Sequence, residues 1–192
     1  MNKRTLLLLL LMVSFNFGRA QFYKSFLPSP EFNNALEKIV LDFRLNFETI
    51  KGENRGQQEE FESYESTIKL PGAEECVINY YHSLADTTAS WQAMMYRGEN
   101  YSEASRTYLN VCRLIKKSRV HWIDRSIIGF TGEMEEPKEN VRFATTTLDL
   151  DLDDRRYNRF KAEVELVSTY SGFEVHLNLH TVRPATDGAV GY

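Results

Sequence analysis

The chain has 192 residues, of which 42% are hydrophobic and 26% are charged, and its formal net charge is −4 at pH 7. A net acidic surface disfavours general binding to nucleic acid or to anionic membranes, because both need a positive field. A chain of this length buries enough surface for one good core, and no low-complexity linker divides it, so the sequence predicts a single domain.

The N-terminus has the pattern of a cleavable signal peptide. Lys3 and Arg4 precede a short apolar run, Leu6–Val13, and small residues close the segment. The run is too short to span a bilayer, which needs about 20 apolar residues. We expect residues 1–20 to be removed and the mature domain, residues 21–192, to be secreted or periplasmic, with no transmembrane segment. A retained N-terminal anchor is the alternative.

The first predicted helix begins after Ser29, which is a good N-cap, with Pro30 at the first helical position. Gly52 is expected to end this helix in a left-handed conformation, and the polar residues 53–60 are expected to form a loop. The apolar stripe that predicts the helix consists of Phe32, Ala35, Leu36, Ile39, Val40, Phe43, Phe47 and Ile50.

Three strand-like segments follow, at residues 64–70, 76–82 and 87–96, and each is rich in residues that favour β-structure. Pro71 and Gly72 mark a turn between the first two segments. Alternation in the third segment predicts one apolar face, made of Ala89, Trp91, Ala93 and Met95.

A second helix is predicted to begin at Asn100, because Asn100 and Glu103 fit the capping-box pattern. Residues 120–141 follow this helix and are expected to form short strands and then an exposed loop. The apolar stripe of the second helix consists of Tyr101, Ala104, Tyr108, Val111, Cys112 and Ile115.

Three more strands are predicted at residues 141–152, 160–169 and 173–182, because apolar and polar residues alternate along each of them. The alternation sends the apolar side chains into the core and the acids and imidazoles outward. Pairing apolar with apolar residues then predicts four pairs of outward neighbours: Glu165 with His176, Lys161 with His180, Asp149 with Glu163, and Asp151 with Lys161.

The order of the elements predicts an α+β fold made of two helix-plus-three-strand units, residues 30–97 and 100–183. The two helices align at a single offset, so internal duplication is one explanation, and chance agreement between two amphipathic helices is the other. Six antiparallel strands would form one sheet with both helices packed on one face. The opposite face of the sheet would then be open to water.

The outward face of the last three strands carries five side chains of the kinds that bind divalent cations. One interpretation is a metal site. The alternative is a solvated face whose charges pair across strands, since a flat sheet face seldom closes a tetrahedral ligand shell. The five candidate ligands are Asp149, Glu163, Glu165, His176 and His180.

The two cysteines leave two interpretations open. Cys76 lies on a predicted strand, and Cys112 lies on the core stripe of the second helix. Export would place them in an oxidising compartment, where a disulfide between them would persist. Two separate buried thiols are the other interpretation, since a domain of this size does not need a covalent link.

The sequence contains no motif for a catalytic nucleophile, a phosphate-binding loop or a metalloprotease. We therefore expect no cofactor and interpret the chain as a non-enzymatic exported module that binds a partner protein or a small ligand. Its expected contact surfaces are the open sheet face and residues 120–141. The alternatives are a metal- or ligand-dependent enzyme that uses the acidic and histidine-bearing face, and a structural protein of the cell envelope.

Overall fold

The structure, a computed structural model, describes residues 27–58, 61–82, 87–139 and 141–182. The predicted signal peptide lies outside these residues. Within them, no helix combines the length and the apolar character that crossing a membrane requires. The helical elements are α2 (Pro30–Asp42), η2 (Phe43–Leu45), η3 (Glu48–Ile50) and α3 (Tyr101–Lys117). The strands are β1 (Lys51–Gln58), β2 (Phe61–Ser66), β3 (Glu75–His82), β4 (Thr87–Gly98), β5 (Val120–His121), β6 (Ile127–Ile128), β7 (Phe130–Thr131), β8 (Phe143–Leu150), β9 (Phe160–Thr169) and β10 (Gly172–Thr181).

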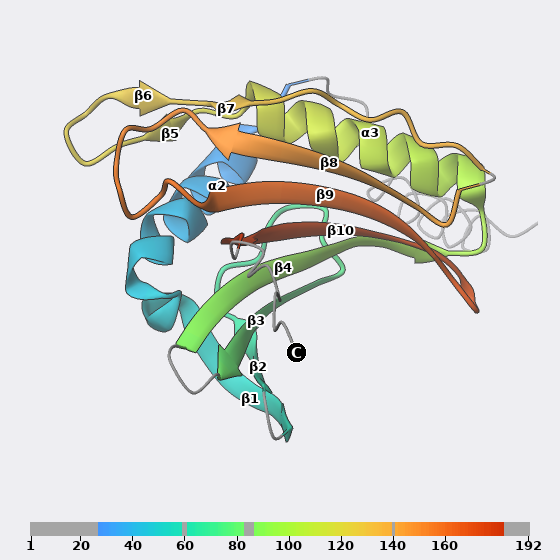
Figure 1. The fold of residues 1–192 in the computed structure, drawn as a ribbon, viewed down its shortest axis with the longest axis horizontal. Coiled ribbons are helices and arrows are strands. Elements are labelled where there is room, and N and C mark those ends of the chain that lie inside the picture. Colours follow the sequence, from blue (N-terminus) through green and yellow to red (C-terminus); the bar gives the residue numbers. More distant parts are fainter. Residues whose placement is uncertain (1–26, 59–60, 83–86, 140, 183–192) are drawn as a thin grey trace, which may run out of the picture.

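Within the described residues, eight strands form one antiparallel sheet in the order β1-β2-β3-β4-β10-β9-β8-β7, and β5 pairs with β6 in a separate hairpin. Figure 1 shows the sheet as a curved layer, with β1 at one end and β8 near α3 at the other. The α+β class and the antiparallel sheet are confirmed. The predicted number of six strands is wrong, because β1 and β7 add a strand at each edge. Internal duplication stays a prediction.

Helix α2 begins where its sequence predicts but ends earlier. The Ser29 hydroxyl accepts a hydrogen bond from the Phe32 amide at 3.2 Å, which confirms the N-cap. The prediction that Gly52 ends the helix is wrong, because the helix ends at Asp42. The Asp42 carboxylate accepts a hydrogen bond from the Thr49 amide at 3.1 Å. This contact bridges the two 3-10 turns η2 and η3, which are joined by two residues with left-handed backbone.

The polar segment predicted as a loop, residues 53–60, is largely strand β1. The segment shows no alternation of apolar and polar residues, because β1 lies at the edge of the sheet. Its register with β2 is also irregular. Polar residues and irregular pairing are typical of edge strands, where they oppose pairing with another chain. Gly52 lies in this strand, where an added Cβ would lie 2.8 Å from the carbonyl oxygen of Glu65. Its small size therefore permits close pairing with β2.

Helix α3 begins as predicted and packs against the centre of the sheet. The Asn100 side chain accepts a hydrogen bond from the Glu103 amide at 3.2 Å. The helix contacts β4, β9 and β10. On β8, the Thr146 hydroxyl lies 2.6 Å from the hydroxyl of Tyr108, so each of these two buried hydroxyls has a hydrogen-bond partner.

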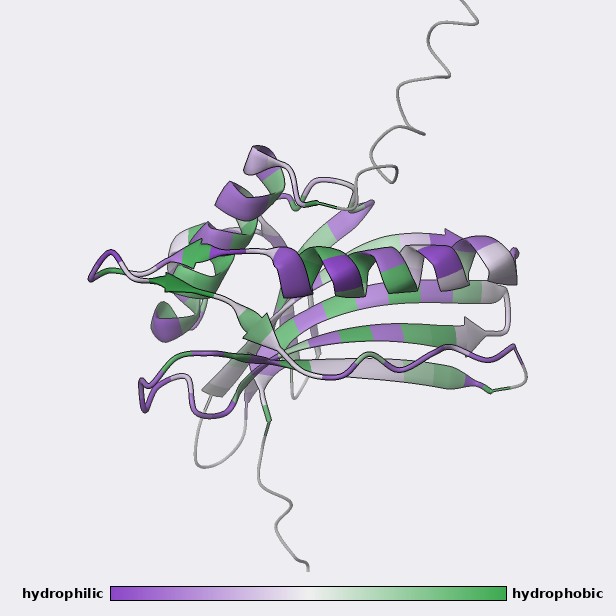
Figure 2. Ribbon diagram, turned by 90° about the horizontal axis from the view of Figure 1, so that it is seen from above, coloured by the Kyte–Doolittle hydropathy of each residue, from purple (hydrophilic) through white to green (hydrophobic). Residues whose placement is uncertain are grey.

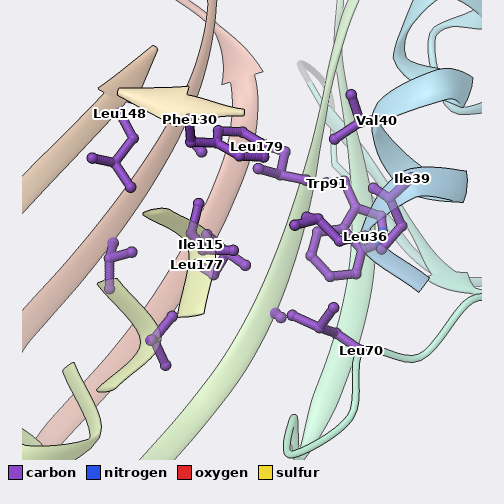
Figure 3. Packing of buried hydrophobic residues seen from close by; sticks show 14 of the residues in the cluster. Leu36, Ile39, Val40, Leu70, Trp91, Ile115, Phe130, Leu148, Leu177 and Leu179 are labelled. Carbon is purple, nitrogen blue, oxygen red and sulfur yellow. The ribbon is translucent and has the colours of Figure 1, made fainter. Parts of the chain in front are cut away.

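Burial confirms the predicted alternation along β4, β8, β9 and β10. Figure 2 shows hydrophilic and hydrophobic residues alternating along them. The first predicted strand, residues 64–70, is wrong in its bounds, because β2 ends at Ser66 and its burial does not alternate. Most apolar strand residues and most residues of the two helix stripes belong to one buried cluster, or pack against it. Figure 3 shows Leu36 and Ile39 of α2 near Trp91 of β4. It also shows Ile115 of α3 beside Leu177 of β10, and both of these residues are fully buried.

The register of the last hairpin, β9–β10, is as predicted. Glu165 pairs with His176, and Lys161 pairs with His180. All four side chains alternate with buried apolar residues along their strands, so they share the outer face of the sheet.

The register of the preceding hairpin, β8–β9, differs from the prediction by two residues. Asp149 pairs with Lys161 instead of Glu163, and Asp151 lies beyond the end of the strand. The connection is longer than predicted, since β8 ends at Leu150 and β9 begins at Phe160. Within it, the Tyr157 hydroxyl donates to a backbone carbonyl of α2 at 2.8 Å and holds the connection against that helix. A shift of two residues keeps every side chain on its predicted face.

Candidate functional site

The outer face of the sheet, opposite the buried cluster, carries a hollow of about 450 Å³. We call it the outer groove. It lies over four neighbouring strands, β3, β4, β10 and β9, which come from both halves of the sequence. Its lining consists of Asn79, Tyr81, Thr88, Ala89, Ser90, Gln92, Glu163, Glu165, Asn178, His180 and Thr181.

The groove exists because its middle strand, β4, carries small outward side chains. Thr88 and Ser90 form its floor. On the β3 side, Tyr81 pairs with Thr88 and Asn79 pairs with Ser90. On the other side, Leu179 of β10 pairs with Trp91, and the adjacent residues His180 and Ser90 both line the groove. Neighbouring side chains on one face are about 4.5–5.5 Å apart, so short side chains between longer ones leave a hollow.

An amide relay crosses the groove and orients one of its carboxylates. Gln92 Nε2 donates to Asn178 Oδ1 at 2.9 Å, and Asn178 Nδ2 donates to Glu165 Oε2 at 2.5 Å. In the described part of the chain, Glu165 Oε1 accepts no hydrogen bond from a protein group. The relay therefore fixes the Glu165 carboxylate and leaves it the capacity to accept a hydrogen bond from a ligand.

The other carboxylate of the groove, Glu163, is already engaged. Its Oε2 lies 2.8 Å from His180 Nε2, and its Oε1 accepts from the Thr147 hydroxyl at 3.2 Å. The hydrogen bond with His180 holds the pKa of Glu163 below its usual value, although partial burial acts in the opposite direction. Glu163 is therefore a charged anchor that positions the imidazole of His180.

We predict that Glu163→Gln makes the fold less sensitive to acid. A carboxylate whose pKa is lowered by folding stabilises the protein above its ordinary pKa of 4.5, and this contribution is lost as pH falls through the lowered value. The free energy of unfolding, measured by urea titration at about pH 6 and about pH 3, should therefore fall less in the variant than in the parent.

The control for this measurement is Glu165→Gln, on the same strand and face. This variant leaves the bond between Glu163 and His180 in place, so the acid sensitivity that comes from this bond should remain. An equal loss of acid sensitivity in both variants would contradict a specific role for the bond between Glu163 and His180.

The five predicted metal ligands share one face, but each has its own partner. Lys161 forms an ion pair with Asp149, and His176 Nε2 lies 3.0 Å from Glu174. Within the described residues, no three His, Cys, Asp or Glu side chains gather as metal ligands do. The geometry therefore gives no support to the metal interpretation, which named Asp149, Glu163, Glu165, His176 and His180.

The two cysteines are separate buried thiols with no disulfide between them. Cys112 lies beside Thr146 of β8, whereas Cys76 lies on β3, four strands away. At about 4.8 Å per strand, this separation exceeds the Cα spacing of up to about 7 Å that a disulfide allows. Burial raises the pKa of each thiol to about 11, so neither is a nucleophile near neutral pH.

The sequence predicted candidate residues on β9 and β10 and none on β3 and β4. Glu163, Glu165 and His180 were among the predicted candidates. The floor residue Ser90 and the relay residue Gln92 were missed, although the predicted alternation of their strand places both outward. The missing information was the pairing of β4 with β10, which joins segments that are far apart in the sequence.

No known protein family, curated protein or solved structure matches this chain. The chemistry of the groove follows from its own amides, hydroxyls, carboxylates and tyrosine ring, which can hydrogen-bond a polar ligand. Among the residues that the structure describes, no Ser or Thr hydroxyl is hydrogen-bonded to His176 or His180. The nucleophile–base pair used in covalent catalysis is therefore not formed at these histidines.

Proposed function

We propose that the protein is an exported, non-enzymatic module that binds a small polar ligand in the outer groove. The observation that carries the proposal is the hollow itself. Its volume of about 450 Å³ lies within the range of about 300–1,000 Å³ that is typical of small-ligand pockets. The pattern of residues 1–20 supports export.

The composition of the groove favours a small ligand over a protein surface. The centre of a protein interface is usually apolar and depleted of charged residues. The groove has polar walls and two half-buried carboxylates, Glu163 and Glu165. Large exposed apolar side chains such as Ile123, Ile127 and Phe143 lie outside its lining. The groove would partly enclose a small ligand, and its polar groups are suited to hydrogen-bonding that ligand.

The groove is also pre-formed. Most of its lining residues stand on regular strands, and each of the four strands is hydrogen-bonded to its neighbour. The relay of Gln92, Asn178 and Glu165 further fixes the polar side chains. A site that is ordered before binding loses less conformational entropy when the ligand arrives, which favours affinity.

We predict that Ser90→Phe abolishes ligand binding while the protein stays folded. The phenyl ring would fill the floor of the groove, and Ser90 faces away from the core, so the buried cluster is preserved. Binding is measured by chemical-shift changes in nuclear magnetic resonance spectra with a panel of monosaccharides, amino acids, diols and amines. Thermal unfolding of the variant verifies that it is folded.

The matched control is Ser63→Phe on β2. Ser63 pairs with Asn79 and is not among the lining residues, so the same substitution adds the same volume beside the groove and leaves its floor unchanged. This variant should bind as the parent does. The proposal fails if the parent binds no member of the panel, or if the two variants reduce binding equally.

A further inference from the structure

We propose that the ligand of the outer groove carries a protonated amine, which the Glu165 carboxylate recognises. The inference rests on the proposed function. Among the described residues, the lining contains two carboxylates and no Lys or Arg. The Glu163 carboxylate is hydrogen-bonded to both His180 and Thr147, whereas Glu165 is hydrogen-bonded to Asn178 alone among the described residues, so Glu165 is the carboxylate of the groove that is open to a ligand. A ligand cation is the complement of such a charge.

The surroundings of Glu165 leave this charge available. Lys161, on the same strand, forms its ion pair with Asp149 of β8. His176, the cross-strand neighbour of Glu165, has its Nε2 bonded to Glu174. The single hydrogen bond that Glu165 accepts from the described residues is the one from the Asn178 amide. An ammonium group would add a charge-assisted hydrogen bond, which is roughly twice as strong as a neutral one.

The other end of the groove offers an aromatic surface. Tyr81 is 43% exposed, and its ring stacks on Phe61 with centroids 6.1 Å apart and planes 23° apart. The stack holds the Tyr81 ring in place at the wall of the groove. An aromatic ring attracts cations and covers alkyl chains. Together these features favour an amine that also carries apolar surface, with its ammonium group at Glu165.

The test compares diaminobutane with butanediol, which have the same length and differ in charge. Isothermal titration calorimetry is carried out on the mature chain at low ionic strength, where charge recognition is least screened. We expect the diamine to bind at least about tenfold more tightly than the diol. Glu165→Gln should weaken diamine binding by about tenfold, because it removes the charge and keeps the shape.

The matched control is Asp151→Asn, which removes an exposed carboxylate just beyond the end of β8, outside the groove lining, and leaves the pair of Lys161 with Asp149 in place. It should change diamine affinity by less than about twofold, as expected for an exposed charge. Equal weakening by Glu165→Gln and Asp151→Asn would show attraction to the overall negative charge and would overturn the amine proposal.

Two further outcomes separate this inference from the proposed function. If butanediol binds as tightly as diaminobutane and Ser90→Phe abolishes that binding, the amine proposal is overturned and the groove remains a ligand site. If neither compound binds, the amine proposal is also overturned, and the wider panel of polar compounds decides the proposed function. Circular dichroism of Glu165→Gln verifies that any loss of binding occurs in a folded protein.

Discussion

Trp91→Ala is expected to lower the free energy of unfolding by about 3–5 kcal/mol, the usual range for truncating a buried Trp or Phe. Trp91 is fully buried in β4, near Leu36 and Ile39 of α2 (Figure 3). Its indole Nε1 donates a hydrogen bond to the buried Ser66 hydroxyl at 2.9 Å. The substitution therefore leaves a cavity between sheet and helix and also removes a buried hydrogen bond.

Trp91→Phe separates these two contributions. It keeps an aromatic ring in the core and removes the indole donor. The Ser66 hydroxyl still donates to the Ile68 carbonyl at 2.8 Å, so the expected loss is smaller, about 1–3 kcal/mol. Equilibrium urea unfolding of the parent and both variants provides the measurement. A loss below about 1 kcal/mol for Trp91→Ala would show that this part of the core collapses around the cavity.

The features that the sequence predicted are those that depend on neighbouring residues. Ser29 and Asn100 cap helices through side-chain contacts three residues away, so their patterns are visible in a short window. Alternation in β9 and β10 has a period of two and places Glu165 and His176 on one face. Such local rules gave the faces of the last strands and one wall of the groove.

The features that the sequence did not predict depend on contacts between distant segments. Gln92 and Asn178 are 86 positions apart, and no local pattern shows that their strands pair. The edge strand that contains Gly52 lacks alternation because an edge needs polar residues. Asp149 pairs with Lys161 after a connection in which Tyr157 bonds to α2, a contact between distant segments that no local pattern shows. These contacts between distant segments explain why the groove residues on β3 and β4 were not predicted.

Gly172→Ala is expected to lower the free energy of unfolding by at least about 2 kcal/mol, because its strain has two sources. Gly172 has a φ of 132°, a conformation that costs an L-residue about 1–3 kcal/mol. An added Cβ would overlap the carbonyl of Gly98, and it would lie 3.0 Å from the Cα of Glu99. These are backbone atoms at the end of β4, so no side-chain rotation relieves the contact and the two strands must separate.

The matched control is Gly56→Ala in the edge strand β1, where an added Cβ meets no atom within 4 Å. Its expected effect on the free energy of unfolding is within about 0.5 kcal/mol. Gly172 begins the strand that brings Asn178 beside Gln92, so Gly172→Ala should also weaken ligand binding at temperatures where it stays folded. Urea unfolding and ligand titration of both variants test this link. Equal, small effects of the two substitutions would mean that the turn adapts and that Gly172 does not hold β4 and β10 in register.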